Sequence, residues 1–212
     1  MCTGRVDLAF IFRAFLKGAD GVIIGGCWPG ECHYVTEGNY DALGNMHLAR
    51  KLLELIGVRP ERIRIKWIAA SEGNRFAEEM SSFAAKIREL GSIAQHEGID
   101  EVERTRKINA VHRIIPYVKL LEREKLRVPI KSEEAYNAFY DSVEVTRLFE
   151  DLVAQKLAIG QILSLLEERP LSTGEISDTL KLTPSEVSTH MNISSRQGLV
   201  WYDVQRSCYA LA

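Results

Sequence analysis

The chain has 212 residues, of which 46% are hydrophobic and 26% are charged, and its formal net charge at pH 7 is −2. This composition is ordinary for a globular protein with one large or two small domains, and the slight acidity argues against a dominant nucleic-acid-binding surface. No apolar run approaches the roughly 18 residues that span a bilayer, and no export signal is recognisable. The four cysteines do not form a secreted disulfide framework, so we expect a reducing, cytoplasmic location.

The first part of the chain alternates between helical and strand patterns. Apolar positions recur at helical spacing over residues 6–16, 39–56 and 74–90, and a glycine closely follows each segment. Between them, residues 22–25 form a short apolar run, and residues 63–68 alternate with period two, as an edge strand does. The order helix, strand, helix, strand, helix with short connections predicts a parallel sheet of the α/β class.

Two strands are too few for a parallel sheet of this kind. Met1 to Gly4 has the character of a loop that leaves a strand, although no strand precedes it. We therefore expect a strand, a helix and another strand ahead of Met1. They would belong to a longer gene product whose start is assigned too late, or a partner would supply them.

Residues 25–34 (Gly-Gly-Cys-Trp-Pro-Gly-Glu-Cys-His-Tyr) join the first predicted strand to the second predicted helix. In open α/β sheets, ligands bind at the carboxyl ends of the strands. Bends at glycine and proline allow Cys27 and Cys32 to turn toward one point, as metal or iron–sulfur ligands must. If residues 6–16 form a helix between neighbouring strands, Cys2 lies on the same rim of the sheet and the three cysteines converge.

Other roles for these cysteines stay open on this pattern. Thiols also pack as small hydrophobes, three thiolates with His33 would make a Cys₃His zinc site, and a redox-active disulfide needs no metal. Cys208 has apolar neighbours and is expected to be structural. His47, His96 and His112 lack partners at ligand spacing and are expected at the surface.

From Gly98 to about Gln155 the pattern is helical and polar, with one break at Val128 and Pro129. Its apolar positions are sparse, which indicates helices that lie against another surface rather than around a large core. We therefore expect a helical linker in this region.

The C-terminal segment carries two capping boxes, at residues 172–175 and 183–186, and each marks the start of a helix. A helix over 157–166 precedes them, and a hairpin over 198–211 follows. This order predicts a winged helix whose recognition helix begins at Thr183. Residues 156–212 hold five basic and six acidic side chains, so phosphate neutralisation would be weak. We expect this unit to dock to a neighbouring protein of a complex rather than to DNA.

Four segments together resemble the delta subunit family of methyl-viologen-reducing hydrogenase, over about residues 1–91. They are residues 1–7 (Met-Cys-Thr-Gly-Arg-Val-Asp), 21–34, 38–40 (Gly-Asn-Tyr) and 70–76 (Ala-Ser-Glu-Gly-Asn-Arg-Phe). The resemblance implies a [2Fe–2S] cluster. It also implies a non-catalytic subunit that passes electrons between a hydrogenase or formate dehydrogenase and the flavin-bearing subunit of a heterodisulfide-reductase-type complex.

Within this resemblance, Cys2, Cys27 and Cys32 match family cysteines and are the candidate cluster ligands. A [2Fe–2S] cluster normally takes four protein ligands. Family members carry a strand and a Cys-x-x-Cys segment upstream, which this sequence does not contain. A fourth ligand would therefore come from a preceding segment, from a partner or from His33.

The resulting prediction is an α/β, flavodoxin-like domain over residues 1–92 with an N-terminally incomplete sheet. A helical linker over 93–154 and a winged-helix domain over 155–212 follow. The predicted function is electron transfer through an iron–sulfur cluster at Cys2, Cys27 and Cys32. The alternative is a redox-sensing transcriptional regulator, in which a cysteine sensor controls the winged helix.

Overall fold

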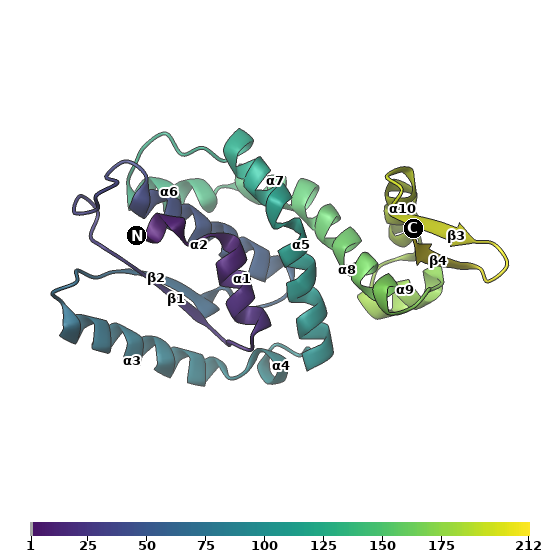
Figure 1. Ribbon diagram of the computed structural model, residues 1–212, viewed down its shortest axis with the longest axis horizontal. Helices are drawn as coiled ribbons and strands as arrows, with labels where there is room; N and C mark the ends of the chain where they lie inside the picture. Colours follow the sequence, from purple (N-terminus) through teal and green to yellow (C-terminus); the bar gives the residue numbers. More distant parts are fainter. Residues whose placement is uncertain (1) are drawn as a thin grey trace.

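The computed structural model describes residues 2–212 and shows a helix-rich α/β unit followed by a smaller C-terminal unit (Figure 1). The α/β unit contains a two-stranded parallel sheet, and the C-terminal unit contains a two-stranded antiparallel sheet. The α/β class predicted from the sequence is confirmed.

The α/β unit begins with the elements whose order the sequence predicted. They are the 3₁₀ turn η1 (Thr3–Arg5), α1 (Leu8–Leu16), β1 (Val22–Gly26), α2 (Gly38–Leu55), the 3₁₀ turn η2 (Pro60–Arg62), β2 (Ile63–Trp67) and α3 (Gly73–Leu90). Their ends lie within two residues of the predicted segments. The predicted order of helices and strands is therefore confirmed.

Strands β1 and β2 pair in parallel, with Val22 opposite Ile63 and Gly26 opposite Trp67. Within residues 2–212, no third strand joins this sheet. The strands expected ahead of Met1 would lie outside the described residues. Both described strands run in the same direction, so the loops that follow them leave from one edge of the sheet.

Helices α1 and α2 cover one face of this sheet, and α3 runs along the other face (Figure 1). Leu8, Phe12 and Phe15 on α1 are fully buried because they share one side of the helix. Helix α3 is more exposed and buries only Phe83 and Leu90. A side chain at Gly21 would overlap Ile87 of α3, so this glycine lets α3 approach the start of β1.

The region predicted as a helical linker adds further helices to the α/β unit. They are α4 (Ile93–His96), α5 (Glu101–Lys125), α6 (Glu133–Tyr140), α7 (Val143–Leu148) and the π-helical turn η3 (Phe149–Val153). Ile108, Val111 and Val118 on α5 belong to the same hydrophobic cluster as the buried faces of α1 and α2. The expectation that this region lacks a large core is wrong. Helix α5 packs against α1, α4 and α8. Because these partners lie on several sides, its apolar residues are distributed around the helix rather than along one face.

The C-terminal unit follows the predicted order of elements. They are α8 (Ala154–Glu168), α9 (Thr173–Leu180), α10 (Pro184–Arg196), β3 (Val200–Asp203) and β4 (Cys208–Leu211). Both capping boxes are formed, by Ser172 with Glu175 and by Thr183 with Glu186. A second hydrophobic cluster holds the unit together. Cys208 is buried on β4, which fits the structural role expected of it.

Across the described part of the chain, none of the helices combines the length and apolar character that crossing a bilayer requires.

Candidate functional site

A cleft of about 760 Å³ lies where the loops leave the carboxyl ends of β1 and β2. Three segments line it: Cys2 and Thr3 at η1, residues of the end of β1 and of the loop that follows it, and residues between Ile68 and Phe76 after β2. Cys2, Cys27 and Cys32 all border this one cleft. The three cysteines therefore border the same cleft, as the sequence predicted, but only Cys2 and Cys32 are in contact.

Cys2 and Cys32 are in direct contact, with their Sγ atoms 3.5 Å apart. Cys32 is buried and Cys2 is half-buried, and both are free thiols. Two thiolates that each lie about 2.3 Å from one tetrahedral metal are separated by about 3.8 Å. The Cys2–Cys32 spacing is therefore close to that of two ligands on a single metal atom.

The first residue of α2 is Gly38, and the two sulfur atoms lie against it. A Cβ atom at Gly38 would lie 2.5 Å from the Cys32 Sγ and 2.6 Å from the Cys2 Sγ. The missing side chain lets both sulfurs reach the N-terminus of an 18-residue helix. Because that end of a helix carries partial positive charge, it favours negative charge placed there, such as that of thiolates or of a metal–thiolate group.

The segment that carries Cys2 is fixed by contacts on both sides. The Thr3 hydroxyl donates a hydrogen bond of 2.8 Å to the carbonyl of Gly25, and the Gly4 amide points at the Cys2 Sγ from 3.5 Å. A Cβ atom at Gly4 would lie 2.8 Å from the carbonyl oxygen of Gly38. A pair of glycines therefore sets the close approach of η1 to α2.

Cys27 is half-buried in the same cleft, and its carbonyl accepts a hydrogen bond from the side-chain amide of Asn39. Among residues 2–212, no three His, Cys, Asp or Glu side chains are grouped closely enough to hold a metal ion. The described chain thus offers one close pair of thiols and a third thiol on the same cleft. This donor set and the space left at Gly38 fit a cluster that takes a further ligand from elsewhere.

The cysteine loop is tied to the loop after β2 through Trp28. The Trp28 indole donates a hydrogen bond of 2.8 Å to Glu72, and the same carboxylate oxygen accepts one of 2.7 Å from the Ala69 amide. These donors lower the pKa of Glu72, and the Ala69 amide has the larger effect. Arg75 lies over the Trp28 ring at 4.5 Å. Glu72 is a site residue that the sequence pattern does not reveal, because its bond to Trp28 joins two different loops.

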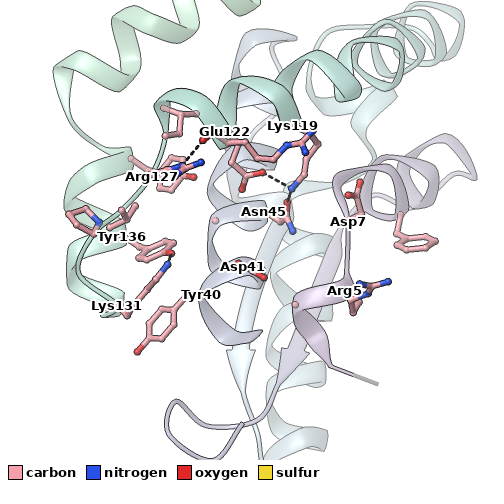
Figure 2. Close-up of a pocket in the computed structure, with 18 residues that line it drawn as sticks. Arg5, Asp7, Tyr40, Asp41, Asn45, Lys119, Glu122, Arg127, Lys131 and Tyr136 are labelled. Carbon is pink, nitrogen blue, oxygen red and sulfur yellow. Dashed lines mark hydrogen bonds and ion pairs between the residues drawn. The ribbon is translucent and has the colours of Figure 1, made fainter. Parts of the chain in front are cut away.

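The other residues near the cysteines take more peripheral positions. His33 and Tyr34 line the cleft, are exposed, and contact each other edge to face at 5.1 Å. Arg5 is exposed and borders a neighbouring cavity (Figure 2).

His47 is buried, so the prediction that it lies at the surface is wrong. It is only 5% exposed and stacks on Tyr140, with the ring centres 4.9 Å apart. Burial lowers its pKa to about 4, with a smaller contribution from Arg50. His96 is exposed as expected, and His112 is half-buried. The residues around His47 in the sequence give no sign that its ring stacks on the distant Tyr140, so the sequence pattern placed it at the surface.

Two protein families match different parts of the chain. The family described as "Methyl-viologen-reducing hydrogenase, delta subunit" matches residues 1–91. The family described as "Bacterial regulatory protein, arsR family" matches residues 161–202. The first match covers the cysteine cleft, and the second covers most of the C-terminal unit.

Several named proteins are similar to the N-terminal part of the chain. The iron-sulfur subunit of the F420-non-reducing hydrogenase of Archaeoglobus profundus is 56% identical over 90 residues, which cover 42% of this chain and 65% of that protein. The iron-sulfur subunit of the F420-non-reducing hydrogenase vhc of Methanococcus voltae is 40% identical over 103 residues, 49% of this chain and 71% of that protein. One subunit of the ferredoxin/F(420)H(2)-dependent CoB-CoM heterodisulfide reductase of Methanosarcina acetivorans is 41% identical over 93 residues, 44% of this chain and 12% of that protein.

The chain spans just under two thirds of the first of these relatives and a small part of the heterodisulfide reductase protein. The similarity includes the segments that form the cysteine cleft, and it agrees with the resemblance seen in the sequence. The chain therefore belongs to the family of methyl-viologen-reducing hydrogenase delta subunits.

Proposed function

We propose that the protein is an iron–sulfur electron-transfer subunit in which Cys2, Cys27 and Cys32 hold a [2Fe–2S] cluster. The observation that carries this proposal is the Cys2–Cys32 pair, whose sulfurs lie 3.5 Å apart at the carboxyl edge of the parallel sheet. The names of the relatives, which are iron-sulfur subunits of hydrogenases, support it. The chain itself would catalyse no bond change.

When bound, a [2Fe–2S] cluster accepts and releases one electron at a time. The residues of this chain would hold and shelter it: Cys32 from its buried position, Cys2 from the segment fixed by Thr3, and Cys27 from the loop after β1. The N-terminus of α2 would offset negative charge at the site. A fourth ligand would come from a preceding segment, from a partner or from His33, which lines the same cleft.

The proposed electron donors and acceptors are other subunits of an oxidoreductase complex. A hydrogenase or formate dehydrogenase would exchange electrons on one side, and the flavin-bearing subunit of a heterodisulfide-reductase-type complex on the other. The names of the hydrogenase and heterodisulfide reductase relatives support both. We place this assembly in the cytoplasm, where thiolate ligands stay reduced.

We propose the following division of labour within the chain. A flavodoxin-like domain (residues 1–92) would carry the cluster, the helices of 93–154 would support it, and a winged-helix domain (155–212) would dock to a neighbouring protein of the complex. The exposed aromatic side chains of the hairpin, Trp201 and Tyr202, are suited to a protein contact. The excess of acidic over basic residues in this unit disfavours DNA.

The test is to purify the protein without oxygen and to measure iron, acid-labile sulfide and the EPR spectrum after reduction. We expect two irons and two sulfides per chain, consistent with the cluster type. Cys32→Ser and Cys27→Ser should lose the EPR signal, whereas Cys208→Ser, at the buried cysteine of β4, should keep it. Zinc in place of iron, or full iron in both cleft variants, would overturn the cysteine assignment.

A second candidate function is a redox-sensing transcriptional regulator, because the arsR-family match covers residues 161–202. In that case α10 would enter the major groove, and oxidation of the cysteines would alter its affinity. An electrophoretic shift with the region upstream of the gene that weakens with salt would favour the regulator. Co-purification with a flavoprotein, without a DNA shift, would favour the electron carrier.

A further inference from the structure

A cavity of about 930 Å³ lies beside η1, between α2, α5 and the segment that joins α5 to α6 (Figure 2). Its size falls within the range of small-molecule binding sites. Arg5 and Asp7 stand on one side of it, and Tyr40, Lys131 and Tyr136 stand on the other side in Figure 2. It shares no lining residue with the cysteine cleft, although a smaller cavity lined by Cys2, Arg5 and Asp41 among others lies between the two.

Positive charge dominates the lining of this cavity, whereas the whole chain has a net charge of −2. Five basic and three acidic side chains border it. Four of the basic ones, Arg5, Arg123, Arg127 and Lys131, are exposed and form no ion pair among residues 2–212. The lining therefore carries more positive than negative charge, which favours a bound anion.

The three acidic side chains of the lining differ in the partners they have. Asp7 accepts a hydrogen bond of 2.9 Å from the Ala9 amide at the start of α1. Glu122 pairs with Lys119, which also donates a hydrogen bond of 3.1 Å to Asn45. Asp41 forms no hydrogen bond or ion pair through its side chain within residues 2–212; partial burial raises its pKa, and the positive charge of Lys131 opposes that rise. Its carboxyl is therefore available to accept a hydrogen bond from a hydroxyl or amine group of a ligand.

One wall of the cavity is aromatic. The rings of Tyr40 and Tyr136 have centres 5.7 Å apart and planes inclined by 31°. The Lys131 Nζ lies 5.8 Å and 5.4 Å from the centres of these two rings, and it donates a hydrogen bond of 2.9 Å to the Tyr136 hydroxyl. Tyr40 is half-buried and lines the cavity, and an aromatic ring of this kind is suited to offset stacking with a flat ligand ring.

We propose that this cavity binds a mononucleotide, with the phosphate on the arginines that line it, the ring on Tyr40 and a sugar hydroxyl on Asp41. Gly44 supports this arrangement, because the atoms nearest to its Cβ position are 3.5 Å away on Glu122 and Tyr140. Because Gly44 has no side chain, the surface of α2 beneath the cavity is recessed. The ring and the sugar would meet α2, and the phosphate would meet side chains from other elements of the lining.

The test measures binding of ADP and of FMN to the intact chain by titration calorimetry, with adenosine and inorganic phosphate as partial ligands. We expect saturable binding of at least one of the two nucleotides that weakens as salt is raised. Each partial ligand should bind at least about tenfold more weakly than the nucleotide, because it uses only one part of the site. Failure of both ADP and FMN to bind would overturn the proposal.

Variants separate the two halves of the site. Arg123→Ala with Arg127→Ala should weaken nucleotide binding by at least about tenfold and leave adenosine binding unchanged. Tyr40→Leu should weaken the nucleotide and adenosine but not phosphate. The matched control, Lys125→Ala with Arg147→Ala, removes two cations that do not line the cavity. Equal binding by wild type and the double arginine variant, or phosphate binding as tight as that of the nucleotide, would refute the site.

The nucleotide site and the cysteine cleft have different lining residues, so the two proposals can be tested separately. Cys32→Ser, which the proposed function expects to lose iron, should bind the nucleotide as wild type does, and Tyr40→Leu should keep full iron. Iron content and nucleotide affinity therefore report the two proposals separately.

Discussion

Gly38 and Cys32 lie so close together that a methyl group on Gly38 would stand 2.5 Å from the Cys32 sulfur. The same methyl group would stand 2.6 Å from the sulfur of Cys2. The lack of a side chain at Gly38 therefore allows the sulfur atoms of two cysteines, 30 positions apart in the sequence, to come together at the start of α2.

We predict that Gly38→Ala abolishes iron binding without unfolding the protein. The new methyl group displaces both sulfurs, but a cysteine can rotate about χ1 to relieve the overlap. Iron content per chain should fall sharply, while the far-ultraviolet circular dichroism stays that of wild type. Full iron in a well-folded Gly38→Ala protein would show that the Cys2–Cys32 contact is not part of the cluster site.

Gly44→Ala provides the matched control within the same helix. Its Cβ atom would meet its nearest neighbours at 3.5 Å, which is an ordinary contact. Alanine in place of glycine inside a helix stabilises it by about 1 kcal/mol. This variant should therefore keep its iron and resist denaturation slightly better than wild type.

The local sequence pattern was enough to predict the elements that depend on neighbouring residues. Hydrophobic period and glycine stops located α2 and α3, and the capping boxes of α9 and α10 form as expected. The convergence of the cysteines also followed, because parallel strands send their carboxyl ends to one edge. Each of these features is set by spacing along a single segment or by sheet direction.

Features that depend on contacts between distant segments could not be predicted in this way. Helix α5 packs against several elements, so its apolar residues form no single face and its sequence pattern looks polar. It also contains Pro116. Arg62 is fully buried, although arginines are mostly exposed in proteins. Its guanidinium bonds with Glu97 and with the carbonyls of Asp20, Leu90 and Gly91, which are brought together only in the folded chain.

Arg62→Met should destabilise the protein by roughly 3–5 kcal/mol. The variant leaves Glu97 buried beside only the weaker contact of Arg59 at 3.5 Å, and it strips three carbonyl groups of their donor. Urea unfolding followed by circular dichroism measures the loss. Lys86→Met is the control, since it breaks a partly exposed pair with Glu89 that is worth less than about 1 kcal/mol. Similar losses in the two variants would contradict a structural role for the Arg62 network.

The buried His47 should make the stability of the protein depend on pH. Its pKa is about 4 in the folded protein, against a usual value of 6.5. The unfolded chain therefore takes up the proton first, so stability is full above pH 6.5 and falls as the pH drops toward 4. Between pH 7 and pH 5, this histidine should cost roughly 2 kcal/mol.

His47→Phe removes the titrating group and keeps a ring to stack on Tyr140. We expect the stability of this variant, measured by urea unfolding, to fall less than that of wild type between pH 7 and pH 5. His96→Gln changes an exposed histidine and should follow wild type. If the difference between wild type and His47→Phe were independent of pH, His47 would have to be protonated as readily in the folded state as in the unfolded chain.

The bond between Trp28 and Glu72 predicts how the cysteine loop is held. Trp28→Phe keeps an aromatic ring for Arg75 to stack on but removes the indole donor to Glu72, which retains its bond from Ala69. The loop between Cys27 and Tyr34 should then open more often, so its amides should exchange hydrogen faster. Faster opening should also release iron sooner to a chelator, because Cys27 and Cys32 lie on the loop that moves.

Trp201→Phe is the control. It removes a comparable indole hydrogen bond, to the Leu211 carbonyl in the hairpin, and should speed exchange only there. Unchanged exchange at residues 27–34 would mean that the backbone and the Asn39 bond to Cys27 hold the loop without Trp28.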